Sequence, residues 1–283
     1  MLATSFVECG LTLPFLLFSF ISEKRMKLRQ VTMASILLMG GTLAHADPVL
    51  TAGASLSFFQ GTFGTNSNID IRYDSTYVQY GDANWRVKLM VPYVSESGLP
   101  NGATLSGGAV VGGTGSSQTH SASGLGDVWL SSHYRIYQGS GLMPSISPYA
   151  KIKFGTASAA DGLGTGRNDY EVGLGLQQTI GTTLFPFANI GYREVGNPTG
   201  QHLRNIATYQ LGVSYVATQR NIFSALFSGS QAITAGAAAP ADLILAWNYN
   251  VTQAGSGLQF FVDKGLSNGS ANYGVGIGGQ IVF

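Results

Sequence analysis

Apolar and polar residues alternate along most of the chain after residue 46. In one representative segment Tyr170, Val172, Leu174 and Leu176 occupy every second position, with glutamate or glycine between them. A period of two places the two sets on opposite faces of a β-strand. We find no stripe with the 3.6-residue period of an amphipathic helix after residue 46, so the pattern predicts an all-β fold.

About twelve such segments follow one another, and most contain ten residues or more. Strands of soluble proteins usually have about 5–6 residues, whereas a tilted strand of about 9–11 residues crosses a membrane. The predicted strands are 52–60, 69–80, 84–96, 125–138, 144–155, 168–180, 183–196, 205–218, 221–231, 241–250, 256–264 and 272–283. The first is the least defined, because 49–60 is also compatible with a periplasmic extension.

Short connections alternate with long ones. Residues 81–83, 181–182 and 218–220 form short links, whereas 97–124, 156–167, 197–204 and 232–240 are longer and rich in small and polar residues. This alternation is typical of an antiparallel up-and-down transmembrane β-barrel with short periplasmic turns and long extracellular loops. Twelve strands bring both chain ends to one side, and ten or fourteen would do so too.

The alternation alone fits a soluble β-sandwich as well as a membrane barrel, so other features must decide. Aromatic residues cluster at strand ends, as interfacial girdles require: Tyr73, Tyr77, Tyr80, Trp85, Tyr93, Tyr134, Tyr192, Tyr215, Trp247 and Tyr249. The last segment places Tyr273, Ile281 and Phe283 on one face and ends on the aromatic residue. This ending resembles the signal read by the outer-membrane barrel assembly machinery, which makes that machinery an expected partner.

The composition also favours a membrane barrel. Only 10% of the 283 residues are charged, whereas soluble domains carry about 25%. Mean hydropathy is nevertheless positive, at +0.17. No run after residue 46 reaches the roughly 18–20 apolar residues of a transmembrane helix. Outer-membrane lipid is therefore the expected surroundings of a barrel over 47–283.

Residues 26–46 read as a signal peptide. Lys27 and Arg29 precede a short apolar stretch, and Ala44-His45-Ala46 fits the small-x-small cleavage pattern. Residues 1–25 contain a second apolar run, which is too short to span a membrane. We interpret 1–25 as a spurious N-terminal extension with Met26 as the initiator, and a membrane anchor is the alternative. The expected location is the outer membrane of a Gram-negative bacterium.

Several kinds of site are excluded. Cys9, the only cysteine, lies ahead of the predicted cleavage site, so no disulfide or thiolate metal site is expected after it. The net charge of +1 offers no basic patch for nucleic acid. The glycine-rich stretches 162–166 and 173–175 lack the following helix of a dinucleotide site, so no cofactor is expected.

The chain from residue 123 onward resembles a known family. Ser123-Gly-Leu-Gly-Asp127, Ser147-Pro-Tyr-Ala-Lys-Ile-Lys-Phe-Gly-Thr156, the run from Gly162 to Gly175 and Asn189-Ile-Gly-Tyr-Arg193 are similar to the outer-membrane transporter family named for the meta-pathway of phenol degradation. The family's usual Pro-Thr-Gly stands here as Phe154-Gly-Thr156. The resemblance implies a transport role.

Charged residues are expected to face the lumen, because an Arg or Lys facing mid-bilayer lipid costs about 2–4 kcal/mol. They either form a conduit that guides solutes or fill a narrow barrel with ion pairs. The predicted lumen-lining residues are Asp70, Arg72, Asp74, Arg86, Lys88, Asp127, His133, Arg135, Lys151, Lys153, Asp169, Glu171, Arg193 and Asp263.

The leading functional hypothesis is an uptake channel for small-molecule solutes, with apolar or aromatic compounds as candidates. Six aromatic residues expected in the lumen suit such solutes and suit packing equally: Trp129, Tyr137, Tyr149, Phe185, Phe187 and Phe261. Loop 97–124 either folds inward as a constriction or lies solvated outside. A non-transporting structural or adhesive barrel is the alternative.

A lipid hydrolase of the outer membrane is the third hypothesis. Ser131 and His133 share a face whereas Ser132 points away, and no third orienting group lies at a suitable spacing. We therefore expect no enzymatic activity and assign no catalytic residue.

Overall fold

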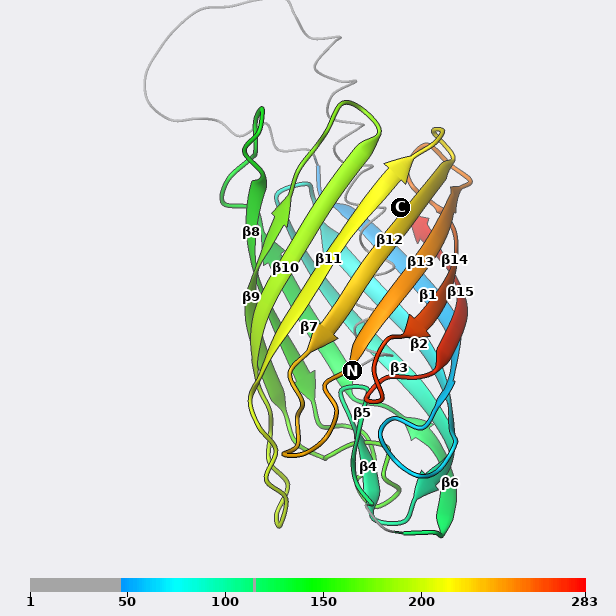
Figure 1. Cartoon of the computed structure of the whole chain (residues 1–283). Helices are drawn as coiled ribbons and strands as arrows, with labels where there is room; N and C mark the ends of the chain where they lie inside the picture. The colour runs from blue at the N-terminus through cyan, green and yellow to red at the C-terminus, as the bar shows by residue number, and fades with distance from the viewer. Residues whose placement is uncertain (1–46, 114–115) are drawn as a thin grey trace, which may run out of the picture.

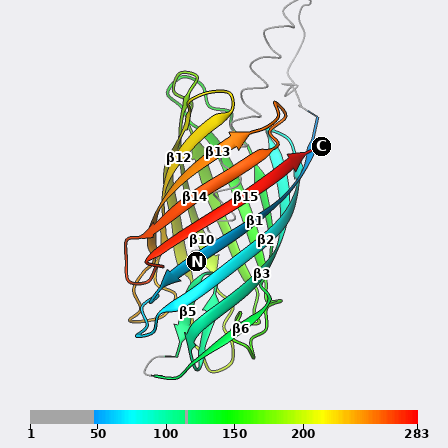
Figure 2. The same cartoon turned by 90° about the vertical axis from the view of Figure 1, so that its right-hand side faces the viewer.

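The computed structural model describes residues 47–113 and 116–283, and these form a β-barrel (Figures 1 and 2). The predicted extension and signal peptide, residues 1–46, lie outside the described residues. The strands are β1 Val49–Gly61, β2 Ile69–Gly81, β3 Trp85–Pro100, β4 Ala103–Ser106, β5 Ala109–Gly112, β6 Thr119–Leu125, β7 Val128–Tyr134, β8 Ser145–Phe154, β9 Asp169–Gln177, β10 Leu184–Glu194, β11 Ile206–Val216, β12 Asn221–Ser230, β13 Ala241–Asn250, β14 Gly257–Gly265 and β15 Tyr273–Val282.

The barrel is closed by β1 and β15. They pair antiparallel from Thr51↔Val282 to Gln60↔Tyr273, so the first and last strands leave no open edge. β6 and β7 both pair with β3 and share one position in the wall. The barrel therefore has twelve strands around its circumference, all antiparallel, which confirms the predicted fold class.

Among the described residues, no helix has the length and apolar character needed to cross a membrane.

The wall is interrupted between β6 and β7, where the sequence predicted one strand over 125–138. β3 pairs with β6 up to Tyr93 and with β7 from Met90, so the break lies opposite Pro92. Proline has no N–H to donate to a neighbouring strand. Thr156 covers the gap, because its hydroxyl donates to the carbonyl of Gly126 and accepts from the N–H of Val128, each at 2.9 Å.

The two ends of the barrel differ. The connections 82–84, 135–144, 178–183, 217–220 and 251–256 lie at the end we call the turn end, together with the C-terminus. The connections 62–68, 101–118, 155–168, 195–205, 231–240 and 266–272 lie at the opposite end, the loop end. Segment 97–124, which the sequence predicted as one long connection, contains the end of β3, the strands β4 and β5, and most of β6.

The outer surface of the barrel is apolar. Side chains such as Leu56, Val172, Ile190, Leu211 and Leu245 project outward and are exposed. Inward positions of the same strands hold small or polar residues, including Ser55, Ser57, Ser214 and Ser228, which are buried. A soluble protein has the opposite arrangement, so the outer face suits the hydrocarbon of a membrane.

Exposed aromatic residues form a girdle at each end of the apolar surface. Tyr80 and Trp85 meet edge to face at 5.6 Å at the turn end. The exposed tyrosines near the loop end are Tyr93, Tyr170, Tyr192, Tyr209 and Tyr273. The prediction was wrong for Tyr73 and Tyr77, which point inward and are buried.

Tyr273, Ile281 and Phe283 all project outward and are exposed. The backbone N–H of Phe283 donates to the carbonyl of Leu50 at 2.9 Å, so the aromatic end of the chain is joined to β1. A role for these three residues in barrel assembly stays a prediction.

A charged substitution on the outer face of the barrel tests whether that face contacts lipid. Leu245 projects outward at the middle of β13 with 50% of its surface exposed. Leu245→Arg should lower the free energy of unfolding by about 2–4 kcal/mol in urea titrations of the lipid-reconstituted barrel, because the charge faces hydrocarbon. Leu266→Arg is the matched control, since Leu266 is equally exposed but follows β14 in a loop. Equal stability of both variants would contradict a lipid-facing surface.

Candidate functional site

The hairpin of β4 and β5 folds into the loop end of the barrel (Figure 1). It is held by loop 155–168: the N–H of Leu105 donates to the carbonyl of Gly162 at 2.8 Å. The hydroxyl of Thr104 lies 3.1 Å from the carbonyl of Gly162 and 2.9 Å from that of Gly164. Segment 97–124 was expected either to fold into the lumen or to lie in solvent outside it. Its hairpin folds into the lumen.

The turn of the hairpin reaches the lumen wall. Gly107 and Gly108 have φ values of +55° and +90°, which favour glycine. A Cβ atom on Gly107 would lie 2.9 Å from Nη1 of Arg193 on β10. The turn therefore passes close to a charged side chain on β10, which lies four strand positions around the wall from β3.

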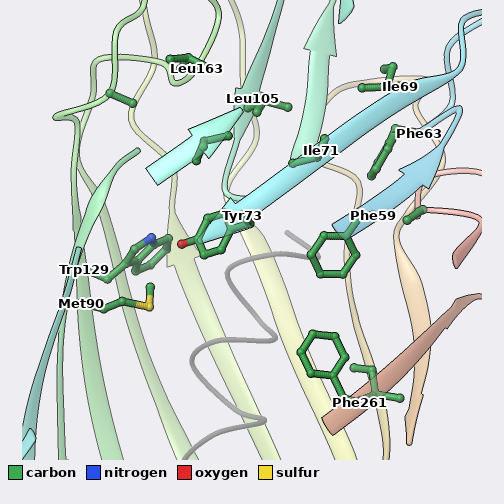
Figure 3. Packing of buried hydrophobic residues seen from close by; sticks show 14 of the residues in the cluster. Phe59, Phe63, Ile69, Ile71, Tyr73, Met90, Leu105, Trp129, Leu163 and Phe261 are labelled. Atoms are coloured by element: carbon green, nitrogen blue, oxygen red, sulfur yellow. The ribbon is translucent and has the colours of Figure 1, made fainter. Parts of the chain in front are cut away.

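An apolar cavity lies beneath the hairpin, and we call it the vestibule (Figure 3). Its volume is about 40 Å³. Most of its lining is apolar or aromatic, and Lys153 and Asp127 are the charged groups in it. The lining residues are Phe59, Phe63, Ile71, Tyr73, Val94, Leu105, Gly107, Gly108, Asp127, Trp129, Lys153 and Leu163.

A buried ion triad borders the vestibule. Nζ of Lys153 lies 3.1 Å from Oδ2 of Asp127 and 3.2 Å from Oδ2 of Asp169. The two carboxylates also accept backbone N–H groups from the loops, from Ala157 at 3.1 Å and from Gly196 at 2.9 Å. The triad thus ties β8 and β9 to the loops above them.

A second polar network centres on Glu171, toward the middle of the barrel. Its carboxylate accepts from Nε of Arg193 at 2.7 Å, from the hydroxyl of Tyr149 at 3.1 Å and from that of Thr208 at 3.3 Å. Nζ of Lys151 lies 3.5 Å away. The guanidinium of Arg193 also stacks on the ring of Trp129, 5.1 Å from its centroid, and so joins this network to the vestibule.

Basic side chains gather in the turn-end half of the lumen. Arg86, Lys88, His133 and Arg135 point inward from the turn ends of β3 and β7. His133 stacks on Tyr149 at 5.4 Å, and Nζ of Lys88 lies 4.2 Å from the centroid of the Tyr77 ring. Within the described strands, no aspartate or glutamate faces the lumen in this half. We call these four residues the basic layer.

Eleven of the fourteen predicted lumen residues face inward. They are Arg86, Lys88, Asp127, His133, Arg135, Lys151, Lys153, Asp169, Glu171, Arg193 and Asp263. The structure brings Asp127, Lys151, Lys153, Asp169, Glu171 and Arg193 together in the triad and the Glu171 network. Asp263 lies apart from both, on β14.

The prediction was wrong for Asp70, Arg72 and Asp74, which lie on the outward face of β2. Arg72 and Asp74 form an ion pair of 2.7 Å, and Arg72 is 62% exposed. Asp74 pairs in register with Tyr93 of the loop-end girdle. The three residues therefore lie at or beyond the membrane boundary, where an outward charge meets water and head groups rather than hydrocarbon.

Sequence reasoning missed most of the vestibule. Phe59, Phe63, Ile71, Tyr73 and Leu105 are buried inside the loop end. The adjacent aromatic residues Phe58 and Phe59 were an available signal, because one of two neighbouring strand residues must point inward. Glu96 and Asp242, also inward and buried, were not predicted either. Of the six aromatic residues expected in the lumen, Tyr137 is exposed outside β7.

Among the described residues, the charged neighbours of His133 do not include the carboxylate that orients the histidine of a Ser-His-Asp site. Ser131 and His133 face the lumen, and Ser132 is exposed on the outer face. The charged groups that act on His133 are Arg86, Lys151 and Lys88, all cations. A general base needs an acceptor that orients it, and these neighbours offer none.

No family model and no curated protein matches this chain. Solved structures are similar in fold. An outer membrane channel from Pseudomonas putida F1 superposes with a TM-score of 0.58 at 12% identity, over 88% of this chain and 100% of that one. The KdgM porin gives 0.53 at 10% identity, over 82% and 99%. The translocator domain of the autotransporter NalP from Neisseria meningitidis gives 0.51 at 10% identity, over 94% and 96%.

These similarities show the fold. The chain has the closed barrel fold of bacterial outer-membrane proteins. Channels, porins and a translocator domain share this fold, so function must be argued from the lumen itself.

The triad predicts a large effect of one lysine. Lys153→Met leaves two buried carboxylates without their shared cation, which costs about 3–5 kcal/mol. The free energy of unfolding in urea should fall by this amount. Lys264→Met is the control, because this exposed ammonium donates to the Asn272 carbonyl and forms no ion pair within 4.0 Å in the described part of the chain. Adding Asp127→Asn and Asp169→Asn to Lys153→Met should restore most of the lost free energy of unfolding. If the triple variant is as unstable as Lys153→Met, the role of Lys153 is not electrostatic.

Proposed function

We propose that this protein is an outer-membrane channel for the uptake of small apolar solutes, including aromatic compounds. The observation that carries the proposal is the vestibule. The lumen of a membrane barrel is usually polar, yet here eight apolar or aromatic side chains surround a space that they do not fill: Phe59, Phe63, Ile71, Tyr73, Val94, Leu105, Trp129 and Leu163.

The position of the vestibule supports uptake. It lies at the loop end, which faces the cell exterior in the usual orientation of such barrels. Phe261 stacks on its lining residue Phe59 at 6.4 Å. Ligand sites are commonly concave, mostly apolar and equipped with a few polar groups. The vestibule has this composition, with Lys153 and Asp127 as its charged groups.

We also propose that the chain is a member of the transporter family named for the meta-pathway of phenol degradation. Its support is the run of short motifs from Ser123 to Arg193. The Asp127 of the first motif, the Lys153 of the second and the Arg193 of the last contribute to the ion pairs around the vestibule. Outer-membrane lipid and the barrel assembly machinery are the proposed partners.

A barrel without transport activity is the second candidate. It is favoured by the inward hairpin and by the two ion networks, which fill much of the loop end. Such a barrel would serve as an adhesin or scaffold through its loops.

A volume substitution separates the two candidates. Val94 on β3 is 4% exposed and lines the vestibule, whereas Val91 on the same strand is 37% exposed on the lipid face. Val94→Trp fills the cavity, so intact Gram-negative cells producing it should take up a neutral naphthylamine dye no faster than cells without the barrel. Cells producing the natural chain or Val91→Trp should take it up faster.

Folding of each variant is checked by its heat-dependent migration on gels. If the natural chain and folded Val94→Trp give the same dye uptake, the channel proposal is wrong and the non-transporting barrel stands.

A further inference from the structure

The basic layer, which the proposed function does not use, points to a second kind of ligand. We propose that it binds small oxyanions, either a free inorganic ion or the carboxylate of a solute, beside His133 in the turn-end half of the lumen. The proposal goes beyond the uptake of apolar solutes and does not depend on it.

His133 lies among cations from both neighbouring strands. On β7 it pairs in register with Arg86 of β3. Two positions along β7, Ser131 pairs with Lys88 of β3 on one side and with Lys151 of β8 on the other. Directly opposed residues in an antiparallel pair have Cβ atoms about 4.5–5.5 Å apart. Arg86, Lys88 and Lys151 are accordingly the charged groups that act on His133.

The contacts of two of these side chains stabilise a cation without neutralising it. Nζ of Lys88 lies 4.2 Å from the centroid of the Tyr77 ring. Nη2 of Arg135, two residues beyond His133 on β7, donates to Oδ1 of Asn84. An aromatic ring and an amide are uncharged groups, so the positive charge of the lysine and of the arginine persists in the wall.

Few carboxylates balance these charges on this side of the barrel. Glu171 lies 3.5 Å from Nζ of Lys151 and 2.6 Å from Nη2 of Arg193, so one negative charge serves two cations. Asp82 in the turn before β3 adds a second carboxylate. Five permanent cations against these two carboxylates leave a net charge of +3: Arg86, Lys88, Arg135, Lys151 and Arg193.

The acids farther along the same wall do not reverse this sign. The triad, toward the loop end, holds two carboxylates and one ammonium and so carries one net negative charge. Glu96 on β3 adds one more, beside His120. The wall therefore stays positive, and its positive charge is concentrated around His133.

The donors around His133 suit an oxyanion. A guanidinium presents parallel N–H groups that match the oxygens of a carboxylate or a phosphate, and an ammonium adds a point charge. The hydroxyl of Ser131 and an N–H of the imidazole are further donors. Neighbouring cations repel one another, so a bound oxyanion relieves repulsion within the wall. Chloride lacks separate oxygens for these donors and should bind less tightly.

Calorimetric titration of the folded full chain in an uncharged detergent tests the proposal. Inorganic phosphate and acetate are the probes, at pH 7, with sodium chloride added to keep the ionic strength constant. At least one probe should bind saturably. Tighter phosphate indicates a free inorganic ion as the ligand, and tighter acetate indicates the carboxylate of a solute. If neither probe binds saturably, the proposal is wrong.

A lysine variant tests the contribution of charge. Lys88→Met should weaken binding of the tighter probe about tenfold, because hydrogen bonds between charged groups are among the strong ones. Lys264→Met changes the net charge of the protein equally, but its ammonium is exposed near the loop end of β14. It should leave binding unchanged. Unchanged binding in folded Lys88→Met, or an equal loss in both variants, would overturn the proposal.

A serine variant tests the position with every charge kept. Ser131→Leu fills the space between Lys88 and Lys151 and should weaken binding about as much as Lys88→Met does. Ser132→Leu alters the adjacent residue, which is exposed on the outer face, and should leave binding unchanged. If Ser131→Leu binds both probes like the natural chain, the site does not lie beside His133. These titrations require no transport, so dye uptake through the barrel does not affect their outcome.

Discussion

A hydrocarbon environment offers no partner for a backbone N–H or C=O group, so every strand that crosses it must be paired on both sides. The pairing of β1 with β15 meets this requirement for the whole molecule. The same environment determines which side chains face outward, and the outer surface from Leu56 to Ile277 is apolar as a result. Polar and charged residues are then directed inward, where each needs a partner or water.

The inward charges of the lumen are arranged in ion pairs and hydrogen-bonded networks. Lys153 lies between two carboxylates, and Glu171 lies beside the two cations Lys151 and Arg193, so each of these inward charges has an oppositely charged neighbour in the wall. The inward hairpin occupies the same end of the lumen as the triad. Its residues Leu105, Gly107 and Gly108 place an apolar side chain and backbone beside Asp127 and Lys153. An apolar cavity next to buried ions is the outcome.

Much of the barrel could be predicted from local pattern, because a period of two fixes both the strand and the face of each residue. The inward placement of Lys151, Lys153, Asp169 and Glu171 follows from that rule. The rule fails for Asp70, Arg72 and Asp74, because β2 continues beyond the membrane and the sequence does not mark where hydrocarbon ends. The hairpin could not be predicted either, since its position depends on contacts with Gly162 and Gly164, about sixty residues away.

The basic layer at the turn end has a consequence for the cell envelope. Arg86, Lys88 and Arg135 place positive charge in the turn-end half of the lumen, which is unfavourable for a solute cation. If the barrel conducts as proposed, inorganic cations therefore cross it less readily than neutral solutes of the same size.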